Sequence, residues 1–376
     1  MNYFLGVAFI LISLFLIDNF VKKRRLKKFK AKLLKNWGKE KKENYYNFFS
    51  IAKYFENNTH KEKAYHIISD KNNIDLDIHA LFKFIDRTSS KIGQQYLYFK
   101  LRTISSINEL LKFHELVTLF QKNKELSISC QLELSKLNTP NSYYLEELIN
   151  GKQIEKTTNI WILKLLTIFS ITSIVGSFFF PFFILFLLPI FCVNSVYHYK
   201  NKGNVNYYLQ GVSQLSKSLK VAKKLSKSSD IKAHYNDFSF IEKIEKIMFK
   251  SEFIGFEKRI DNEWLFAFWL LIELIKIMFN VEYLVFYSFL DAITKERKNI
   301  ESLFLFIGEI DAAISTASLK SGDLNTTTPI FNNKNELQFS EIYHPLIKKC
   351  IKNDLNLVDK SMLLTGSNMS GKSTFI

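Results

Sequence analysis

Residues that would mark a disulfide framework or a metal centre are scarce in this sequence. Among 376 residues there are three cysteines, Cys130, Cys192 and Cys350, which lie far apart and have no paired metal-binding spacing. A disulfide-rich secreted domain is therefore excluded, and a reduced, cytosolic setting is expected. Glycine is scarce as well, at 12 residues, so a short stretch that concentrates glycine stands out from the rest of the chain.

Acidic residues are too few to balance the basic ones. The chain has 36 Asp and Glu against 52 Lys and Arg, which gives a formal net charge of +16. This excess suits an anionic partner, either a nucleic acid or a lipid surface, although heavy use of Lys, Asn, Ile and Phe could also produce it. With 47% hydrophobic and 23% charged residues the chain is not disordered, and its length allows two or three domains.

The first segment of the chain predicts a membrane anchor. Residues 3–17 are almost wholly apolar, residues 19–21 extend the run, and about 18 residues at about 1.5 Å each nearly cross a bilayer core about 30 Å thick. A dense run of Lys and Arg follows from Lys22 to Lys35, whereas a signal peptide would carry its charges before the apolar run. We expect an uncleaved anchor whose N-terminus is outside, followed by a cytosolic basic region that could contact lipid headgroups.

A second apolar region predicts a membrane hairpin. Residues 160–175 and 178–193 form two runs near spanning length, separated by Gly176 and Ser177. Both ends of the pair are basic, as a cytosol-to-cytosol hairpin requires. The flanking lysines are Lys152, Lys156, Lys200 and Lys202. A very apolar hairpin buried in a soluble core is the alternative.

Two later stretches are expected to be helices of a soluble region. Residues 264–290 are apolar enough for another crossing, but Glu273 and Lys276 interrupt them, and each charge costs about 2.5–3.5 kcal/mol at the centre of a membrane helix. We expect a soluble helix there, one that could rest on the membrane. Apolar residues at helical spacing then predict a long helix buried along one stripe. These residues are Ile300, Leu303, Phe304, Ile307, Ile310, Ile314 and Ala317.

Helix starts can also be placed in the preceding region. The Ser/Thr cluster before Lys91 and the capping box from Ser106 to Glu109 each predict the N-terminus of a helix. The second of these helices should present one apolar face, made of Ile107, Leu110, Phe113, Val117 and Phe120.

The most specific local pattern lies between Gly366 and Ser373. Gly366, Gly371, Lys372 and Ser373 fit G-x-x-x-x-G-K-[ST], behind residues 362–365, an apolar run of strand length. The glycines let backbone N–H groups approach nucleotide phosphates, Lys372 would reach the β- and γ-phosphates, and the Ser373 hydroxyl would help to hold Mg²⁺. The sequence therefore predicts a site for ATP and Mg²⁺.

The predicted site consists of the loop alone. Its nucleotide-binding residues are Gly366, Ser367, Asn368, Met369, Ser370, Gly371, Lys372, Ser373 and Thr374, with Ser373 as the magnesium ligand. Nothing after the loop could supply a second carboxylate or a group that positions water. We therefore assign no catalytic residue, and we expect residues 1–376 alone to hydrolyse no ATP.

Four stretches, taken together, resemble one protein family. Residues 365–374 closely resemble the Walker A motif of the MutS family of DNA mismatch-repair ATPases, including the Asn-Met pair inside the loop. Residues 86–97 resemble the start of the MutS core domain, and residues 307–312 resemble the end of its lever helices. Tyr343-His344-Pro345-Leu346, followed by Asn353-Asp354, is similar to the beginning of its ATPase domain. The order matches the family, and the resemblance covers roughly residues 74–125 and 260–376.

This resemblance implies ATP and Mg²⁺ binding, association with DNA and, at full length, a homodimer. The sequence also departs from the family. A membrane anchor stands where mismatch-reading members carry a domain with a Phe-x-Glu wedge, and the predicted hairpin stands where the family has lever and clamp helices. Cys350 lies near the place where some members offer an aromatic residue to adenine. Direct mismatch recognition is therefore not expected.

Together these features predict a mainly α fold. It consists of a helical MutS-like core and lever region with membrane helices, followed by the start of an α/β P-loop ATPase domain. The expected domains are an anchor (1–21), a basic juxtamembrane region (22–73), a first MutS-like core segment (74–157), a transmembrane hairpin (158–199), a helical lever with a second core segment (200–322), and a linker with a truncated ATPase domain (323–376).

The expected function is that of a membrane-anchored MutS-like ATP-binding protein. It would lie in the inner (cytoplasmic) membrane with several crossings and with its soluble domains in the cytosol. Two alternatives remain open. One is a nucleotide-switched membrane scaffold that binds a protein partner, and the other is an inactive, truncated fragment.

Overall fold

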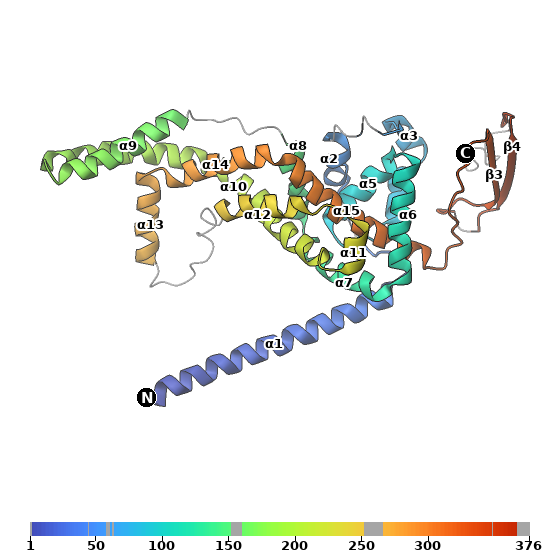
Figure 1. Cartoon of the computed structure of the whole chain (residues 1–376), viewed down its shortest axis with the longest axis horizontal. Helices are drawn as coiled ribbons and strands as arrows, with labels where there is room; N and C mark the ends of the chain where they lie inside the picture. Colours follow the sequence, from blue (N-terminus) through green and yellow to red (C-terminus); the bar gives the residue numbers. More distant parts are fainter. Residues whose placement is uncertain are drawn as a thin grey trace.

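The computed structural model describes residues 2–43, 45–57, 61, 64–151, 160–251, 266–347 and 349–366 (Figure 1). As predicted, these residues form a mainly helical structure, and its strands form two small antiparallel pairs, β1–β2 and β3–β4. The elements are α1 (Asn2–Asn36), α2 (Phe48–Asn57), β1 (His66–Ile67), α3 (Asp70–Asp75), α4 (Ile78–Ile85), α5 (Lys91–Arg102), β2 (Thr103–Ile104), α6 (Ile107–Lys122), α7 (Lys124–Leu134), η2 (Ser135–Leu137), η3 (Pro140–Tyr144), α8 (Leu145–Asn150), α9 (Ile160–Ser177), η4 (Pro181–Phe186), α10 (Leu187–Leu225), α11 (Ser229–His234), α12 (Ser239–Ser251), α13 (Phe266–Met278), α14 (Val281–Lys295), α15 (Arg297–Lys320), β3 (Glu336–Ile342) and β4 (Asn353–Val358).

Helix α15 runs through the centre of the core, with α5, α6, α8 and α12 packed against it. The predicted apolar stripe is confirmed, because all seven of its residues are fully buried. Tyr54 of α2 stacks on Phe304, with ring centroids 4.1 Å apart. By length and composition α15 could also cross a membrane, but 72% of its apolar window is buried inside the protein. We therefore treat it as a core helix.

The predicted helix starts are confirmed, with one correction. Ser90 caps α5 by accepting a hydrogen bond from the Gly93 N–H, and Ser106 caps α6 by accepting one from the Glu109 N–H. The apolar face of α6 is displaced toward its C-terminus, since Leu116 is fully buried and Ile107 is 49% exposed. The first turn of α6 extends past the edge of the core, so helical spacing alone placed Ile107 wrongly.

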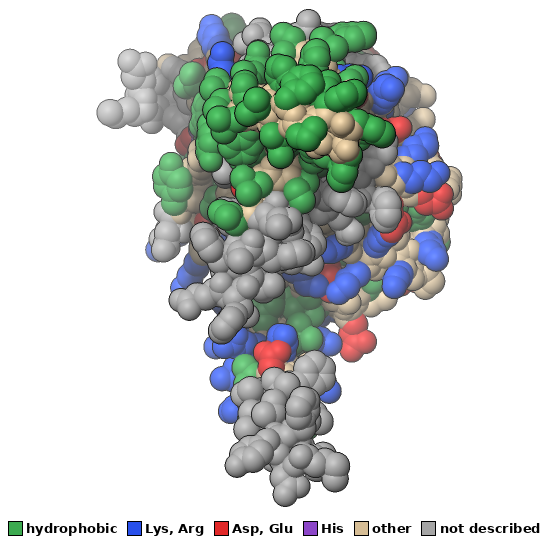
Figure 2. Space-filling model, turned by 90° about the vertical axis from the view of Figure 1, so that its left-hand side faces the viewer, with side chains coloured by type: hydrophobic (Ala, Val, Ile, Leu, Met, Phe, Trp, Pro, Cys, Tyr) green, Lys and Arg blue, Asp and Glu red, His purple; other side chains and the backbone are tan. Residues whose placement is uncertain are grey.

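Helix α9, the 3₁₀ turn η4 and the start of α10 form a hairpin that projects from the core (Figure 1). Only 17% of the α9 window and 11% of the window from Pro181 to Lys200 are buried. Figure 2 looks onto this end of the molecule and shows apolar side chains gathered over it. The alternative of a hairpin buried in a soluble core is therefore wrong. Helix α10 continues without a break into the core, for 39 residues in all.

Helix α1 is a single helix of 35 residues that contains both the predicted anchor and the basic run after it. It leaves the core on the same side as the hairpin (Figure 1). Its end is fixed to the core by Gly38, whose N–H donates to Ser318 Oγ over 3.0 Å and whose φ is +82°. The Gly38 backbone lies so close to Gly322 that a side chain at either position would meet main-chain atoms.

Residues 264–290 were expected to form one helix, and the described residues of this stretch form two. Asn280, at φ +50°, takes the left-handed conformation that often ends a helix, and it separates α13 from α14. We call this α13–turn–α14 corner the elbow. The elbow packs against the hairpin: α13 contacts α10, and α14 contacts α9.

Candidate functional site

The predicted nucleotide loop lies almost wholly outside the described residues. Gly366 is described, whereas Ser367 through Thr374 are not. Residues 362–365 were expected to form a strand, but the described chain has no ladder there, and Leu363 is 88% exposed. A strand of a parallel sheet is normally buried between neighbouring strands. The described strands nearby form only the β3–β4 ribbon, so residues 362–365 have no such neighbours among the described residues.

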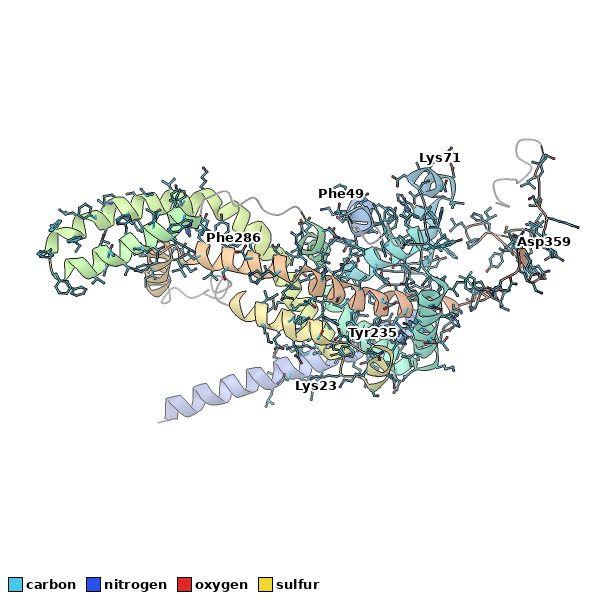
Figure 3. All side chains as sticks on the ribbon, turned by 45° about the horizontal axis from the view of Figure 1, so that its top comes forward. Lys23, Phe49, Lys71, Tyr235, Phe286 and Asp359 are labelled. Atoms are coloured by element: carbon cyan, nitrogen blue, oxygen red, sulfur yellow. The ribbon has the colours of Figure 1, made fainter. Side chains whose placement is uncertain are left out.

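The β3–β4 ribbon pairs Asn353 and Asp354, the second half of one predicted motif, with the two residues that directly precede its first half. Asn353 pairs with Ile342 in the ladder, and Asp354 Oδ1 accepts a hydrogen bond of 2.6 Å from the Glu341 N–H. The turn between the strands is closed by the His344 N–H, which lies 3.4 Å from Cys350 Sγ. This ribbon, with Asp359 at its end, lies at the opposite end of the molecule from the hairpin and Phe286 (Figure 3).

Two other motifs, about 220 residues apart in sequence, meet at one buried carboxylate. Asp311 on α15 accepts hydrogen bonds from the Ser89 and Ser90 N–H groups, each 2.8 Å long, and from Ser90 Oγ, 2.6 Å long. Burial raises the pKa of Asp311 to about 6, and the three donors oppose that shift without cancelling it. These hydrogen bonds join α15 to the N-terminus of α5, and we call this contact the junction.

Glycines let the two helices approach closely enough for that contact. A Cβ on Gly93 would lie 2.1 Å from Asp311 Oδ2, and a Cβ on Gly308 would lie 2.5 Å from the Tyr96 Cβ. Both distances are far below van der Waals contact. Each motif therefore contributes one glycine at which the other helix fills the space of a side chain.

A charge network surrounds this junction and includes the chain that follows α1. Lys41 lies 3.1 Å from Asp86 and 2.8 Å from Glu43, and Lys91 pairs with Glu43 as well. Burial alone would lower the pKa of Lys41, but Asp86 and Glu43 outweigh it and raise the pKa. Gln94 Nε2 also donates to Asp86 over 2.9 Å. The chain that follows α1 is thus tied to the core by charge as well as by packing.

At the other end of the molecule, hairpin side chains bind the C-terminus of α13. Ser170 Oγ and Asn194 Nδ2 each donate a hydrogen bond of 2.8 Å to the Met278 carbonyl. Thr167 Oγ1 donates to the Phe279 carbonyl over 2.9 Å. The last carbonyls of a helix lack partners within the helix, so the hairpin supplies the groups that α13 needs.

The charges of α13 turn inward, which sequence reasoning missed. Glu273 is 9% exposed and lies 3.4 Å from His198 of α10, and Lys276 lies 3.7 Å from Glu273. The outward face of α13 is apolar and includes Leu270 and Leu274, each 47% exposed. Because both charges turn inward, Glu273 and Lys276 do not prevent the outward face of α13 from contacting an apolar environment.

These features define a mainly helical protein with an apolar hairpin at one end and, at the other, a β ribbon that leads to a phosphate-loop sequence. No family model matches the chain, and no solved structure matches it.

The chain is, however, similar to curated bacterial proteins described as "DNA mismatch repair protein MutS". It is 35% identical over 104 residues to the protein of Lysinibacillus sphaericus, 33% identical over 108 residues to that of Clostridium botulinum, and 34% identical over 106 residues to that of Oceanobacillus iheyensis. Each match covers 26% of this chain and 11% to 12% of the relative. The predicted MutS-like relationship is confirmed for about a quarter of the chain.

Proposed function

We propose that this protein is a membrane-tethered, MutS-like ATP-binding protein that engages DNA under the control of the bound nucleotide. The G-x-x-x-x-G-K-S sequence from Gly366 to Ser373, in a chain similar to mismatch-repair proteins, carries the proposal. Lys372 would bind the nucleotide phosphates, Ser373 would bind Mg²⁺, and the protein would act as a homodimer. The net charge of +16 supports contacts with DNA phosphates.

The membrane aspect of the proposal rests on the hairpin. Trp161 and Tyr199 are 68% and 64% exposed at the end nearest the core, and such residues favour the boundary between lipid and water. The tip is apolar and includes Phe178, which is 84% exposed. Helix α1 leaves the core on the same side, so a single inner (cytoplasmic) membrane could receive both elements while the core stays in the cytosol (Figure 1).

Nucleotide and DNA binding can be tested on the native protein extracted from membranes in mild detergent. We expect crosslinking of a photoreactive ATP analogue to be lost in Lys372→Ala and kept in Lys360→Ala, a control that removes a nearby lysine outside the motif. We expect the logarithm of the DNA affinity to fall linearly with the logarithm of the salt concentration. If no DNA is retained at low salt, the proposed DNA binding is wrong.

Insertion of the hairpin has a native probe. Cys192 is exposed at the start of α10, within the hairpin. In a Cys350→Ser background, we expect Cys192 in intact membranes to resist a membrane-impermeant maleimide and to react after denaturation. A cysteine placed at exposed Lys227, beyond the hairpin, should react in inside-out vesicles. Equal labelling of both positions would show that the hairpin lies outside the lipid.

One observation favours a second function, a nucleotide-switched scaffold for a protein partner. The densest basic run, from Lys22 to Lys35, is on α1 next to the predicted anchor, where lipid would compete with DNA for it. If ATP crosslinks as expected while DNA is not retained, this second function replaces the first.

A further inference from the structure

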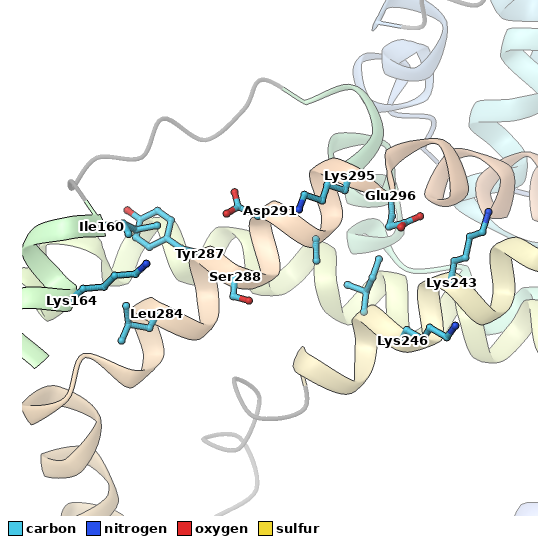
Figure 4. Close-up of a pocket in the computed structure, with 12 residues that line it drawn as sticks. Ile160, Lys164, Lys243, Lys246, Leu284, Tyr287, Ser288, Asp291, Lys295 and Glu296 are labelled. Carbon is cyan, nitrogen blue, oxygen red and sulfur yellow. The ribbon is translucent and has the colours of Figure 1, made fainter. Parts of the chain in front are cut away.

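A basic cavity of about 510 Å³ lies where the hairpin joins the core (Figure 4). Three elements that are distant in sequence supply its lysines: α9 supplies Lys164, α12 supplies Lys243 and Lys246, and α14 supplies Lys295. In Figure 4, Lys164 of α9 and Lys295 at the end of α14 extend toward each other, whereas Lys243 and Lys246 of α12 point away from them. The cavity is therefore built by the fold rather than by one basic segment.

The charge of the cavity suits an anion. Its four lysines face two carboxylates, Asp291 and Glu296, which leaves a net charge of +2 at the wall. Among the residues that the structure describes, none of the four lysines forms an ion pair. A phosphate group held between Lys164 and Lys295 would gain ammonium donors from both, and the Ser288 hydroxyl on the same wall could add another, while Lys243 and Lys246 add positive charge from α12.

The position of the cavity indicates where the anion comes from. Lys164 is on the second turn of α9, next to exposed Trp161, at the level where the apolar hairpin surface begins. Ile160 and Leu284 add apolar wall on the hairpin side. The cavity thus has a charged side toward the core and an apolar side toward the hairpin, the arrangement of a phospholipid headgroup above its acyl chains. Basic pockets beside membrane helices on the cytosolic side bind acidic headgroups in this way.

We propose that this cavity binds the phosphate of an anionic phospholipid headgroup. The proposal rests on the insertion of the α9–α10 hairpin into a membrane, as argued above. A soluble phosphate compound shares the same chemistry, but it would make no use of the apolar wall or of the position beside Trp161. The bound lipid would bridge α9, α12 and α14 and so fix the hairpin against the core.

The test uses the full chain in vesicles and in detergent. In detergent, native mass spectrometry would count bound phosphatidylglycerol and phosphatidylcholine with the same acyl chains. We expect preferential retention of phosphatidylglycerol. The test variant carries Lys164→Gln, Lys243→Gln, Lys246→Gln and Lys295→Gln. The matched control carries Lys217→Gln, Lys220→Gln, Lys227→Gln and Lys232→Gln, which removes the same charge from exposed positions on and after α10.

Each lysine near an anionic headgroup changes affinity by about five-fold, so the test variant should lose at least about ten-fold in phosphatidylglycerol binding while the control stays within about two-fold. All eight lysines are exposed, so both variants should melt at the wild-type temperature. Equal losses in the two variants would overturn the cavity as the site. Displacement of the lipid by equimolar inorganic phosphate would reassign the site to a soluble phosphate and overturn the lipid assignment.

Cys192 labelling of the same proteins in vesicles separates this proposal from the one on which it rests. If Cys192 is protected and the test variant still binds phosphatidylglycerol as the wild type does, only the cavity proposal fails. If Cys192 is labelled, the hairpin is not inserted, and the lipid assignment fails together with the membrane aspect of the proposed function.

Discussion

Replacing Gly308 by alanine should destabilise the core, although alanine is the better helix former. Gly308 is in the middle of α15, where the added Cβ would lie 2.5 Å from the Tyr96 Cβ and 2.8 Å from its Cγ. The Tyr96 Cβ is attached to the α5 backbone, so no side-chain rotation relieves the overlap. Helices α5 and α15 would have to separate, which would stretch the hydrogen bonds between Asp311 and Ser90.

Two effects of opposite sign set the change in the free energy of unfolding that Gly308→Ala causes. Overpacking of a well-packed core costs about 1–3 kcal/mol, whereas alanine gains about 1 kcal/mol over glycine in a helix interior. The junction is fixed by buried hydrogen bonds on one side and by a packed helix on the other, so we expect the upper end of the overpacking range. The net loss should be about 1–2 kcal/mol.

Gly211→Ala is the matched control. Gly211 is in α10, and its added Cβ would meet Leu148 Cδ2 at 3.0 Å, the end of a flexible side chain. This variant should keep or slightly raise the stability. Thermal melting of the full chain in detergent should separate the two variants by about 2 kcal/mol, or about 4–8 °C. If Gly308→Ala melts at or above Gly211→Ala, the close packing of α5 on α15 is refuted.

Two further predictions concern other regions of the core. Asp311 has a pKa of about 6 in the native state, whereas an ordinary Asp has one near 3.8, so this group removes up to about 3 kcal/mol of stability as the pH rises from 4 to 7. In Asp311→Asn, melting curves across that range should lack this fall of stability with pH. An unchanged fall would refute the raised pKa of Asp311. Asn194→Leu should lower the stability by about 1–3 kcal/mol, because it removes one of the two hairpin donors to the Met278 carbonyl and leaves buried Asn280 Nδ2 without its Asn194 Oδ1 acceptor. Val193→Leu, at an exposed neighbouring position, should melt like the wild type.

Much of the fold could be predicted because it depends on local patterns. Ser90 and Ser106 cap helices where the sequence predicts helix starts, and the period of the apolar residues identifies the buried stripe of α15. The two apolar runs separated by Gly176 and Ser177 likewise form a hairpin. Each of these features is set by residues within a few turns of one another.

The contacts between distant segments could not be predicted in this way. Nothing near Asp311 indicates that its carboxylate binds Ser89 and Ser90, because those partners are about 220 residues away. The inward orientation of Glu273 depends on His198, which is on a different helix. The one available signal was Asn280, a polar residue with a turn preference inside an apolar stretch, and it could have located the elbow.

Helix α15 connects the two ends of the molecule. At its N-terminus it follows α14, whose Tyr283 hydroxyl donates to the Tyr197 carbonyl of the hairpin helix α10 over 2.7 Å. Near its C-terminus, Ser318 accepts a hydrogen bond from Gly38, directly after the helix that carries the predicted anchor.

A helix of 24 residues spans about 36 Å, and because α15 is packed along its length it can transmit displacement only as a rigid body. The chain from 321 to 335, which has neither helix nor strand, is the softer connection to the β3–β4 ribbon. Motion of the ribbon would therefore be absorbed largely in this segment. If the proposed nucleotide binding is coupled to the hairpin end, the coupling requires contacts from the nucleotide loop or the ribbon onto α15 itself.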